Sequence, residues 1–334
     1  MKRSSIERVV RVHAPGGAEM LRLDRVRVRS PGPGEVRIRH HACGLNFIDV
    51  YFRSGLYPLD LPAGLGMEAA GVVEAVGEGV AHLQLGDRVA YACQPPGAYS
   101  SARVMPAKNV VCLPDGIDFD TGAAMMLKGL TAQYLLRRTQ PQGGLAPGDF
   151  VLFHAAAGGV GLIACQWARH LGVTVIGTVG SEEKAELARA HGATHVINYR
   201  TDNFVERVRQ ITNGAGVPVV YDGVGADTWD GSLDCLSPRG MMVSFGNASG
   251  AVPPFSPGVL AQKGSLYLTR PVLMTYTASR QDLVASAAAL FEVIVNGAVE
   301  IPVNQVYPLA EAAQAHRDLE ARKTTGSTVF SVGG

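Results

Sequence analysis

The pattern of hydrophobic and polar positions changes once along the chain. Up to about residue 120, short runs of β-branched residues are broken by glycine and proline turns, as at Pro31–Gly34. We predict strands at Val26–Arg29, Glu35–His40 and Gly71–Val76. This pattern is typical of a compact body of short antiparallel strands.

From about Thr121 the apolar positions take helical spacing, with a helix predicted over Met125–Arg138. Strands and helices then alternate, which predicts an α/β fold with a doubly wound parallel sheet. The predicted strands are 150–154, 173–178, 195–198, 217–222 and 241–245, and the helices 160–171, 182–191, 204–211 and 229–236. A helix over Gln281–Asn296 precedes a mixed tail that we expect to return to the first domain.

Charge and cysteine usage narrow the function classes. The 30 basic and 29 acidic side chains nearly cancel, which disfavours a broad basic field for nucleic acid or an anionic membrane. Five scattered cysteines without a C-x-x-C pair disfavour a disulfide framework and favour the cytoplasm, and we find no apolar stretch typical of a signal peptide or membrane span. Arginines alternating along the first strands predict one solvated sheet face: Arg22, Arg25, Arg27, Arg29, Arg37 and Arg39.

A cluster of small residues lies between a predicted strand and a predicted helix. It is a variant of the dinucleotide fingerprint, A-x-x-G-x-x-G, in which small residues let a pyrophosphate approach the backbone at a helix N-terminus. A plain tight turn is the alternative, but the flanking strand and helix favour dinucleotide binding. The residues concerned are Ala155, Gly158, Gly159, Val160 and Gly161.

The next strand indicates which dinucleotide is bound. NAD sites usually carry an acid at its tip, whereas this chain has Gly177–Gly180 there. Ser181, Lys184 and Tyr199 follow, and a hydroxyl with an ammonium suits a 2′-phosphate, so the sequence favours NADPH. The alternative is that Lys184 only pairs with a neighbouring glutamate on a solvated helix.

Several motifs in order carry a resemblance over nearly the whole chain, from about Val9 to Val329. The chain resembles the zinc-free NADPH:quinone oxidoreductases of the zeta-crystallin type, a branch of the medium-chain dehydrogenase/reductase superfamily. The matching segments are Cys43–Asp49, Arg53–Pro58, Gly66–Gly71, Lys128–Thr131, Ala155–Gly161 and Val243–Asn247.

The resemblance implies two domains. A GroES-like β domain, residues 1–130 and 272–334, would carry the substrate pocket, and a Rossmann domain, residues 131–271, would bind NADPH. The active site would lie in the cleft between them. Relatives dimerise through the last Rossmann strand, here Leu266–Thr269, which would otherwise be an exposed edge.

The resemblance also bears on metals. Zinc-dependent relatives use a cysteine and a histidine, and this chain has Asn46 and Met67 at those positions, with no cysteine or acid near Lys128 for a third ligand. Zinc needs about three N, S or O protein ligands. We therefore expect neither zinc nor flavin, only NADPH.

By resemblance, Asn46, Tyr51 and Tyr57 line the quinone pocket, where a phenol can donate a hydrogen bond to a quinone oxygen while its ring packs on the substrate. The alternative is that Asn46 caps a turn and the tyrosines only pack. Further cofactor-binding residues implied by the resemblance are Thr131, Gly223, Val224, Phe245, Gly246, Asn247, Arg270 and Gly326.

Two other functions stay open at this point. Conjugated alkenes accept a hydride in a similar geometry, so a 2-alkenal or enoyl reductase is the nearest alternative. The alternative from another class is an NADPH-binding structural or RNA-binding protein of the zeta-crystallin type. Acceptor profiling separates the first pair, and a salt-dependent gel shift tests RNA binding.

Overall fold

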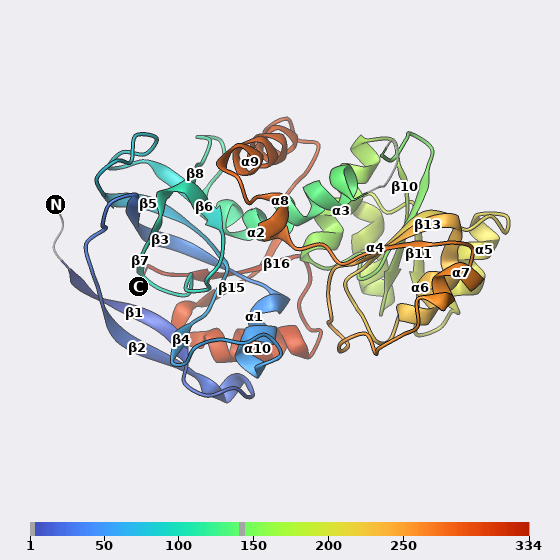
Figure 1. Cartoon of the computed structure of the whole chain (residues 1–334), viewed down its shortest axis with the longest axis horizontal. Helices are drawn as coiled ribbons and strands as arrows, with labels where there is room; N and C mark the ends of the chain where they lie inside the picture. The colour runs from blue at the N-terminus through green and yellow to red at the C-terminus, as the bar shows by residue number, and fades with distance from the viewer. Residues whose placement is uncertain (1–3, 140–143, 334) are drawn as a thin grey trace. The chain divides into compact units, whose positions relative to one another are not determined.

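The computed structural model describes residues 4–139 and 144–333, and the chain divides into two compact units (Figure 1). Unit 1 contains the segments 1–128, 277–291 and 301–334, and unit 2 contains 129–276 and 292–300. Two helices, α2 (Phe119–Arg138) and α9 (Arg280–Val295), include residues of both units.

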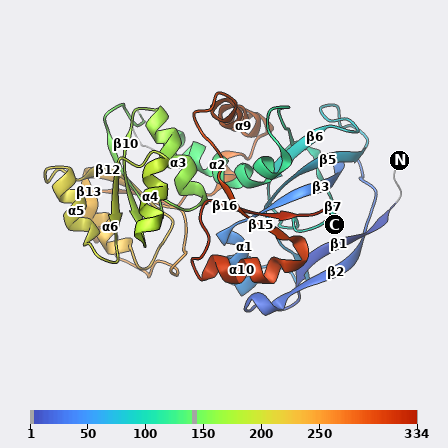
Figure 2. The same ribbon diagram turned by 180° about the vertical axis from the view of Figure 1, so that it is seen from behind.

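Unit 1 is built on β-sheets. A three-stranded sheet has the order β2-β1-β4, and a seven-stranded sheet has the order β15-β16-β3-β5-β6-β8, with β7 also paired to β3 (Figure 2). The strands are β1 (Ser5–Val12), β2 (Leu21–Val28), β3 (Glu35–Leu45), β4 (Ala63–Gly64), β5 (Glu68–Val76), β6 (Arg88–Ala92), β7 (Ala102–Pro106), β8 (Val111–Cys112), β15 (Val303–Pro308) and β16 (Ser327–Ser331). The helices α1 (Phe47–Ser54) and α10 (Ala312–Glu320) and three 3₁₀ turns, Ala18–Met20, Ala107–Asn109 and Leu309–Glu311, complete it.

Unit 2 is a six-stranded parallel sheet with the order β11-β10-β9-β12-β13-β14. The chain starts at β9, builds outward to β11 and then returns to β12, so the strand order reverses between β9 and β12. Ligands of open α/β sheets bind at such a reversal, outside the carboxyl ends of the strands. The strands are β9 (Phe150–Phe153), β10 (Thr174–Val179), β11 (His195–Asn198), β12 (Val217–Asp222), β13 (Leu236–Ser244) and β14 (Tyr267–Thr269).

Two pairs of helices cover the strands of unit 2. Helix α3 contacts α4 over β10, and α5 contacts α6 over β11 and β12. Right-handed crossovers place the two pairs on opposite faces of the sheet. The helices are α3 (Gly159–His170), α4 (Glu182–Ala190), α5 (Phe204–Ile211), α6 (Trp229–Cys235), α7 (Gly258–Gln262) and α8 (Leu273–Tyr276). In the described part of the chain, no helix combines the length and the apolar character needed to cross a membrane.

The predicted α/β fold, with a GroES-like part and a doubly wound Rossmann sheet, is confirmed. Strands His195–Asn198 and Val217–Asp222 and helix Phe204–Ile211 have the predicted bounds. Strand β3 is longer than predicted and runs on to Leu45, because it pairs with β5, β7 and β16 in turn.

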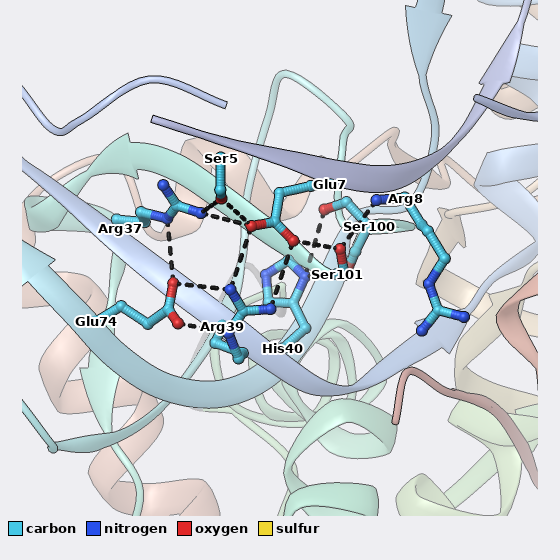
Figure 3. A network of polar contacts seen from close by, with 9 residues as sticks. All are labelled: Ser5, Glu7, Arg8, Arg37, Arg39, His40, Glu74, Ser100 and Ser101. Carbon is cyan, nitrogen blue, oxygen red and sulfur yellow. Dashed lines mark hydrogen bonds and ion pairs between the residues drawn. The ribbon is translucent and has the colours of Figure 1, made fainter. Parts of the chain in front are cut away.

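The prediction of one solvated arginine face is wrong for Arg37, which is 0% exposed. Its Nη2 donates to Glu7 Oε1 at 2.6 Å and its Nε donates to Glu74 Oε2 at 3.1 Å (Figure 3). Arg39 shares the face, as alternation requires, and bonds both carboxylates. Strand β1 brings Glu7 over this face, and a register shift in the β3–β5 pairing brings Glu74, so Arg37 is buried with both carboxylates while the Arg39 side chain stays 40% exposed. We call Glu7, Arg37, Arg39 and Glu74 the arginine–carboxylate network.

Candidate functional site

The turn between β9 and α3 has the geometry that its small residues predict. Ala155 adopts a left-handed conformation with φ of 55°, and Gly158 N–H donates to its carbonyl oxygen at 2.9 Å. Ala156 N–H donates to Thr178 O at 3.0 Å, which ties the turn to β10. Helix α3 then begins at Gly159, with Gly158 as its N-cap.

Gly161 leaves no room for a side chain, and Gly158 leaves little. A Cβ at Gly161 would lie 2.6 Å from the Ala156 carbonyl oxygen, and one at Gly158 would lie 3.2 Å from that of Ala155. Ala155 is exposed and the segment Gly158–Val160 is half-buried, so the outer surface of the turn is accessible. The first N–H groups of a helix attract anions, and the turn therefore fits a pyrophosphate.

The residues predicted at the tip of β10 gather around Gly180. Ser181 is the N-cap of α4, and its Oγ accepts a hydrogen bond from Lys184 N at 3.3 Å. Tyr199 N–H donates to Val179 O at 3.1 Å, and the Tyr199 hydroxyl lies over Gly180, where a Cβ would come within 2.5 Å of it. The Ser181 hydroxyl and the Tyr199 phenol thus lie at the start of α4, and Lys184 belongs to the first turn of that helix.

One of the acidic residues of α4, Glu182, pairs with an arginine of the same helix. Glu182 Oε1 accepts from Arg189 Nη1 at 2.7 Å on the exposed side of α4. Lys184 itself is half-buried, beside Ser181.

The loops after β12 and β13 pack against each other. Phe245 N–H donates to Asp222 O at 2.7 Å, and a Cβ at Gly223 would lie 2.9 Å from the Phe245 ring. Asp222 Oδ1 accepts from Val224 N at 2.8 Å and from Gly225 N at 3.0 Å, which fixes the first loop. Both loops lie at carboxyl ends of strands, the edge where ligands bind in such sheets.

Four further predicted residues are spread over both units. Arg270 is exposed, and its Nη1 donates to Ser244 O at 2.9 Å, while Asn247 O accepts from Gly250 N at 3.0 Å. Thr131 is buried in α2 within unit 2. Gly326 belongs to unit 1 and has φ of 56°, just before β16.

In unit 1, helix α1 positions the residues predicted to bind the substrate. Asn46 is its N-cap, and Asn46 N–H donates to Asp49 Oδ2 at 2.9 Å. Tyr51 is buried on α1, and Tyr57 is half-buried beyond its end. Tyr57 N–H donates to Tyr51 O at 3.0 Å, and the two rings pack edge to face with centroids 5.3 Å apart.

A buried charge cluster lies behind Asn46. Glu68 Oε1 accepts from Asn46 Nδ2 at 2.7 Å and from Lys128 Nζ at 2.6 Å, and Glu68 Oε2 accepts from Leu127 N at 2.6 Å. The carboxylate therefore holds both the amide of Asn46 and the ammonium of Lys128. A buried carboxylate is stabilised by such paired donors.

Asp49 extends this cluster. It is fully buried, and its Oδ2 accepts from Tyr99 Oη at 2.8 Å, whereas Oδ1 has no hydrogen-bond partner among the described residues. Burial raises the pKa of Asp49 to about 7, against the hydrogen bonds from Tyr99 and Asn46, which lower it.

Comparisons with known proteins decide the family. The chain is 57% identical to the quinone oxidoreductase of Pseudomonas aeruginosa over 318 residues, which cover 95% of this chain and 97% of that protein. The chain belongs to the quinone oxidoreductase family. It is also 48% identical to the 2-haloacrylate reductase of a Burkholderia species, over 96% of this chain and 97% of that protein.

The fold of this quinone oxidoreductase family member agrees with solved structures. The Escherichia coli quinone oxidoreductase complexed with NADPH has a TM-score of 0.95 at 50% identity, covering 97% of this chain and all of that one. Residues 32–140 match the model of the alcohol dehydrogenase GroES-like domain, and residues 159–289 match that of the zinc-binding dehydrogenases. Together these place the family within the medium-chain dehydrogenase/reductase superfamily.

Although one matching model is named for zinc, the positions of the expected ligands hold other residues with other partners. Asn46 is bonded to Glu68, and Met67 is a buried apolar side chain. Over residues 4–139 and 144–333 no three His, Cys, Asp or Glu side chains group together as a metal site requires.

Sequence reasoning assigns no role to several residues that support the site. Glu68, Asp49 and Tyr99 hold the N-terminus of α1, and Asp222 holds the loop after β12. The signal for Asp49 was present, because an Asn followed three residues later by an acid is a helix-start pattern. The partners of the other residues lie on distant elements and left no local pattern.

Proposed function

We propose that the protein is an NADPH-dependent quinone reductase that uses neither metal nor flavin. The observation that carries the proposal is the turn of small residues where the strand order of unit 2 reverses, with Ser181, Lys184 and Tyr199 at the next strand tip. A relative of 50% identity has been solved with NADPH, which supports the same cofactor here.

Each part of the dinucleotide has residues suited to it. The N–H groups at Gly158–Gly161 bind the pyrophosphate, and Ser181, Lys184 and Tyr199 bind the 2′-phosphate. The loops after β12 and β13 border the nicotinamide ribose. The residues in this last group are Gly223, Val224, Phe245, Gly246 and Asn247, with Thr131, Arg270 and Gly326 near the cofactor.

When bound, the nicotinamide supplies a hydride. A quinone that takes up one hydride and one proton becomes a hydroquinone, and negative charge develops on its oxygen before the proton arrives. Asn46, Tyr51 and Tyr57 donate hydrogen bonds to the quinone oxygens and hold the ring. A quinone or activated alkene needs less polarisation than a ketone, so donors of this kind suffice.

The decisive test is NADPH oxidation by chelator-treated protein with a small benzoquinone, with NADH as the parallel cofactor. We expect turnover with NADPH that the chelator does not change and that NADH does not match. Tight NADPH binding without quinone turnover would contradict the quinone assignment.

A second activity is favoured by one specific observation. The 2-haloacrylate reductase, 48% identical to this chain, is by its name a reductase of an activated alkene. We propose reduction of conjugated alkenes as the alternative. Comparing kcat/KM for benzoquinones with that for 2-alkenals and 2-haloacrylates on one preparation ranks the two substrate classes.

We further propose a homodimer in the cytoplasm. Strand β14 ends the six-stranded order, and its Tyr267 is exposed, so a second copy can pair with this edge. The five cysteines are free thiols, as a reducing compartment favours. The inward Arg37 shortens the arginine row and weighs against the RNA-binding alternative. Sedimentation of wild type against Leu268→Pro tests the dimer.

A further inference from the structure

A chain of buried polar side chains lies beneath the cofactor loops of unit 2. His154 Nδ1 lies 2.8 Å from Thr178 Oγ1, and His154 Nε2 lies 2.9 Å from Ser232 Oγ. Ser232 Oγ donates to Asp222 Oδ2 at 2.8 Å. All four side chains are at most 1% exposed. We call Thr178, His154, Ser232 and Asp222 the hydroxyl–imidazole chain.

The direction of each hydrogen bond follows from Asp222. Its two oxygens accept four donors, because Val224 N and Gly225 N bond Oδ1 while the hydroxyls of Thr228 and Ser232 bond Oδ2. The one proton of Ser232 is thus committed to Asp222. Its oxygen must therefore accept from His154, so the imidazole carries its proton on Nε2.

The other imidazole nitrogen then accepts from the Thr178 hydroxyl. Burial lowers the pKa of His154, against the charge of Asp222, which raises it, so the imidazole is neutral. Every hydrogen bond in the chain points the same way, from Thr178 through His154 and Ser232 to Asp222.

The positions of these residues in the sheet are regular. Leu152, Ile176 and Val220 are paired neighbours on β9, β10 and β12 and belong to the apolar core. His154, Thr178 and Asp222 lie two residues further along each strand direction, on the same face. One apolar row is thus followed, at the carboxyl edge, by one polar row.

Each member of the polar row lies within two residues of a loop assigned to the cofactor. His154 precedes the turn Ala155–Gly161, Thr178 precedes the tip at Gly180, and Asp222 holds the loop Gly223–Gly225. Buried polar groups are costly unless every partner is present. Apolar residues would fill the same space but would not fix the loops through directed bonds.

We propose that the hydroxyl–imidazole chain is a positioning element that holds the three dinucleotide-binding loops at fixed places relative to one another. This inference rests on the proposed NADPH function. The hydroxyl–imidazole chain is not a catalytic triad, because the serine lies between the histidine and the aspartate and none of the groups reaches solvent.

Thr178 offers the sharpest test, because it has two nearly isosteric replacements. Thr178→Val removes the hydroxyl that donates to His154, and Thr178→Ser keeps it. We expect the Kd for NADPH, measured by fluorescence titration, to rise about tenfold in Thr178→Val and in Ser232→Ala and to stay near wild type in Thr178→Ser. Val208→Ala, in the core of α5, is the control for loss of stability without loss of a loop contact.

The donor and acceptor roles within the hydroxyl–imidazole chain can be measured separately, by the tautomer of His154. In ¹⁵N-histidine spectra, with the His154 signals assigned by their loss in His154→Gln, wild type should show the Nε2–H tautomer. In Asp222→Asn the amide nitrogen donates to Ser232, which must then donate to His154. The proton of His154 should move to Nδ1.

The outcomes separate two failures. An unchanged Kd in Thr178→Val and Ser232→Ala, at a Tm loss equal to that of Val208→Ala, overturns the positioning role, and an Nδ1–H tautomer in wild type overturns the bond directions. A wild-type protein that binds no NADPH would instead refute the proposed function itself.

Discussion

Two of the buried polar systems described above, the arginine–carboxylate network and the hydroxyl–imidazole chain, differ in charge and in place. The arginine–carboxylate network of unit 1 joins four charged groups in the middle of strands, where Glu7 from β1 meets Arg37 on β3 and Glu74 on β5 (Figure 3). The hydroxyl–imidazole chain of unit 2 has a single carboxylate and lies at strand ends, under loops.

This difference indicates that buried polar groups have two separate roles in this molecule. Paired charges within strands are costly to break, since the partner left behind stays buried and unpaired, so they bear on stability. Hydroxyls and an imidazole in line fix the direction of the loops above them. Stability and cofactor affinity should therefore respond to separate substitutions.

The largest effect is expected from Arg37→Met. It removes the buried guanidinium that bonds Glu7 and Glu74 and leaves both buried carboxylates with the 40% exposed Arg39 as their cationic partner, so the free energy of unfolding should fall by about 3–5 kcal/mol. Urea denaturation measures this change. The Kd for NADPH of the folded fraction should not change.

Arg25→Met is the matched control, because Arg25 lies exposed on β2. Its free energy of unfolding should stay within about 0.5 kcal/mol of wild type. If Arg37→Met were as mild as Arg25→Met, the network would not stabilise the fold.

Asp49 tests what a buried carboxylate does without a bonded cation. Burial raises its pKa from 3.8 to about 7. The contribution of Asp49 to the free energy of unfolding is therefore highest below about pH 4, where Asp49 is protonated, and falls as the pH rises towards 7. Asp49→Asn keeps an oxygen for Asn46 N and Tyr99 Oη. Between pH 4 and 8 the wild type should lose up to about 4 kcal/mol relative to Asp49→Asn.

Glu7 should behave in the opposite sense. Burial alone raises its pKa, but hydrogen bonds from Ser101, Ser5 and Arg39 outweigh burial and lower the pKa from 4.5 to about 2. The stability from Glu7 is therefore present above about pH 4.5 and is lost as the pH falls towards 2. In Glu7→Gln the free energy of unfolding should fall by about 3 kcal/mol less over this pH range than in wild type, as measured by denaturation curves taken across it. An equal fall in the two proteins would contradict this prediction.

The arginine–carboxylate network also shows how far sequence reasoning can predict burial. Alternation placed Arg37 and Arg39 on one face, but only the approach of β1 and the shifted β5 register decides that this face is partly internal. A charged row predicts solvent unless carboxylates from other strands are known to cover it. The strand and helix bounds of unit 2 were better determined, because apolar runs between turn residues are local signals.

The same limit applies to the candidate site. The turn at Ala155–Gly161 and the grouping of Ser181 with Tyr199 followed from spacing along consecutive elements. The partners of His154 lie 24 and 78 residues away, on β10 and α6, so its place in a chain of hydrogen bonds had no local signature.

The smallest expected effect sharpens the comparison most. Lys184→Ala should raise the Kd for NADPH about five- to tenfold, or about 1 kcal/mol, and leave that for NADH unchanged, because only NADPH carries the 2′-phosphate. If the hydroxyl–imidazole chain positions the tip of β10, Thr178→Val already misplaces Lys184. The double variant Thr178→Val/Lys184→Ala should then lose less free energy of NADPH binding than the two single variants together, by at least about 0.5 kcal/mol. Lys184→Ala combined with Glu7→Gln should be additive, since that network only stabilises unit 1. Additivity in both cycles would show that the hydroxyl–imidazole chain does not position Lys184.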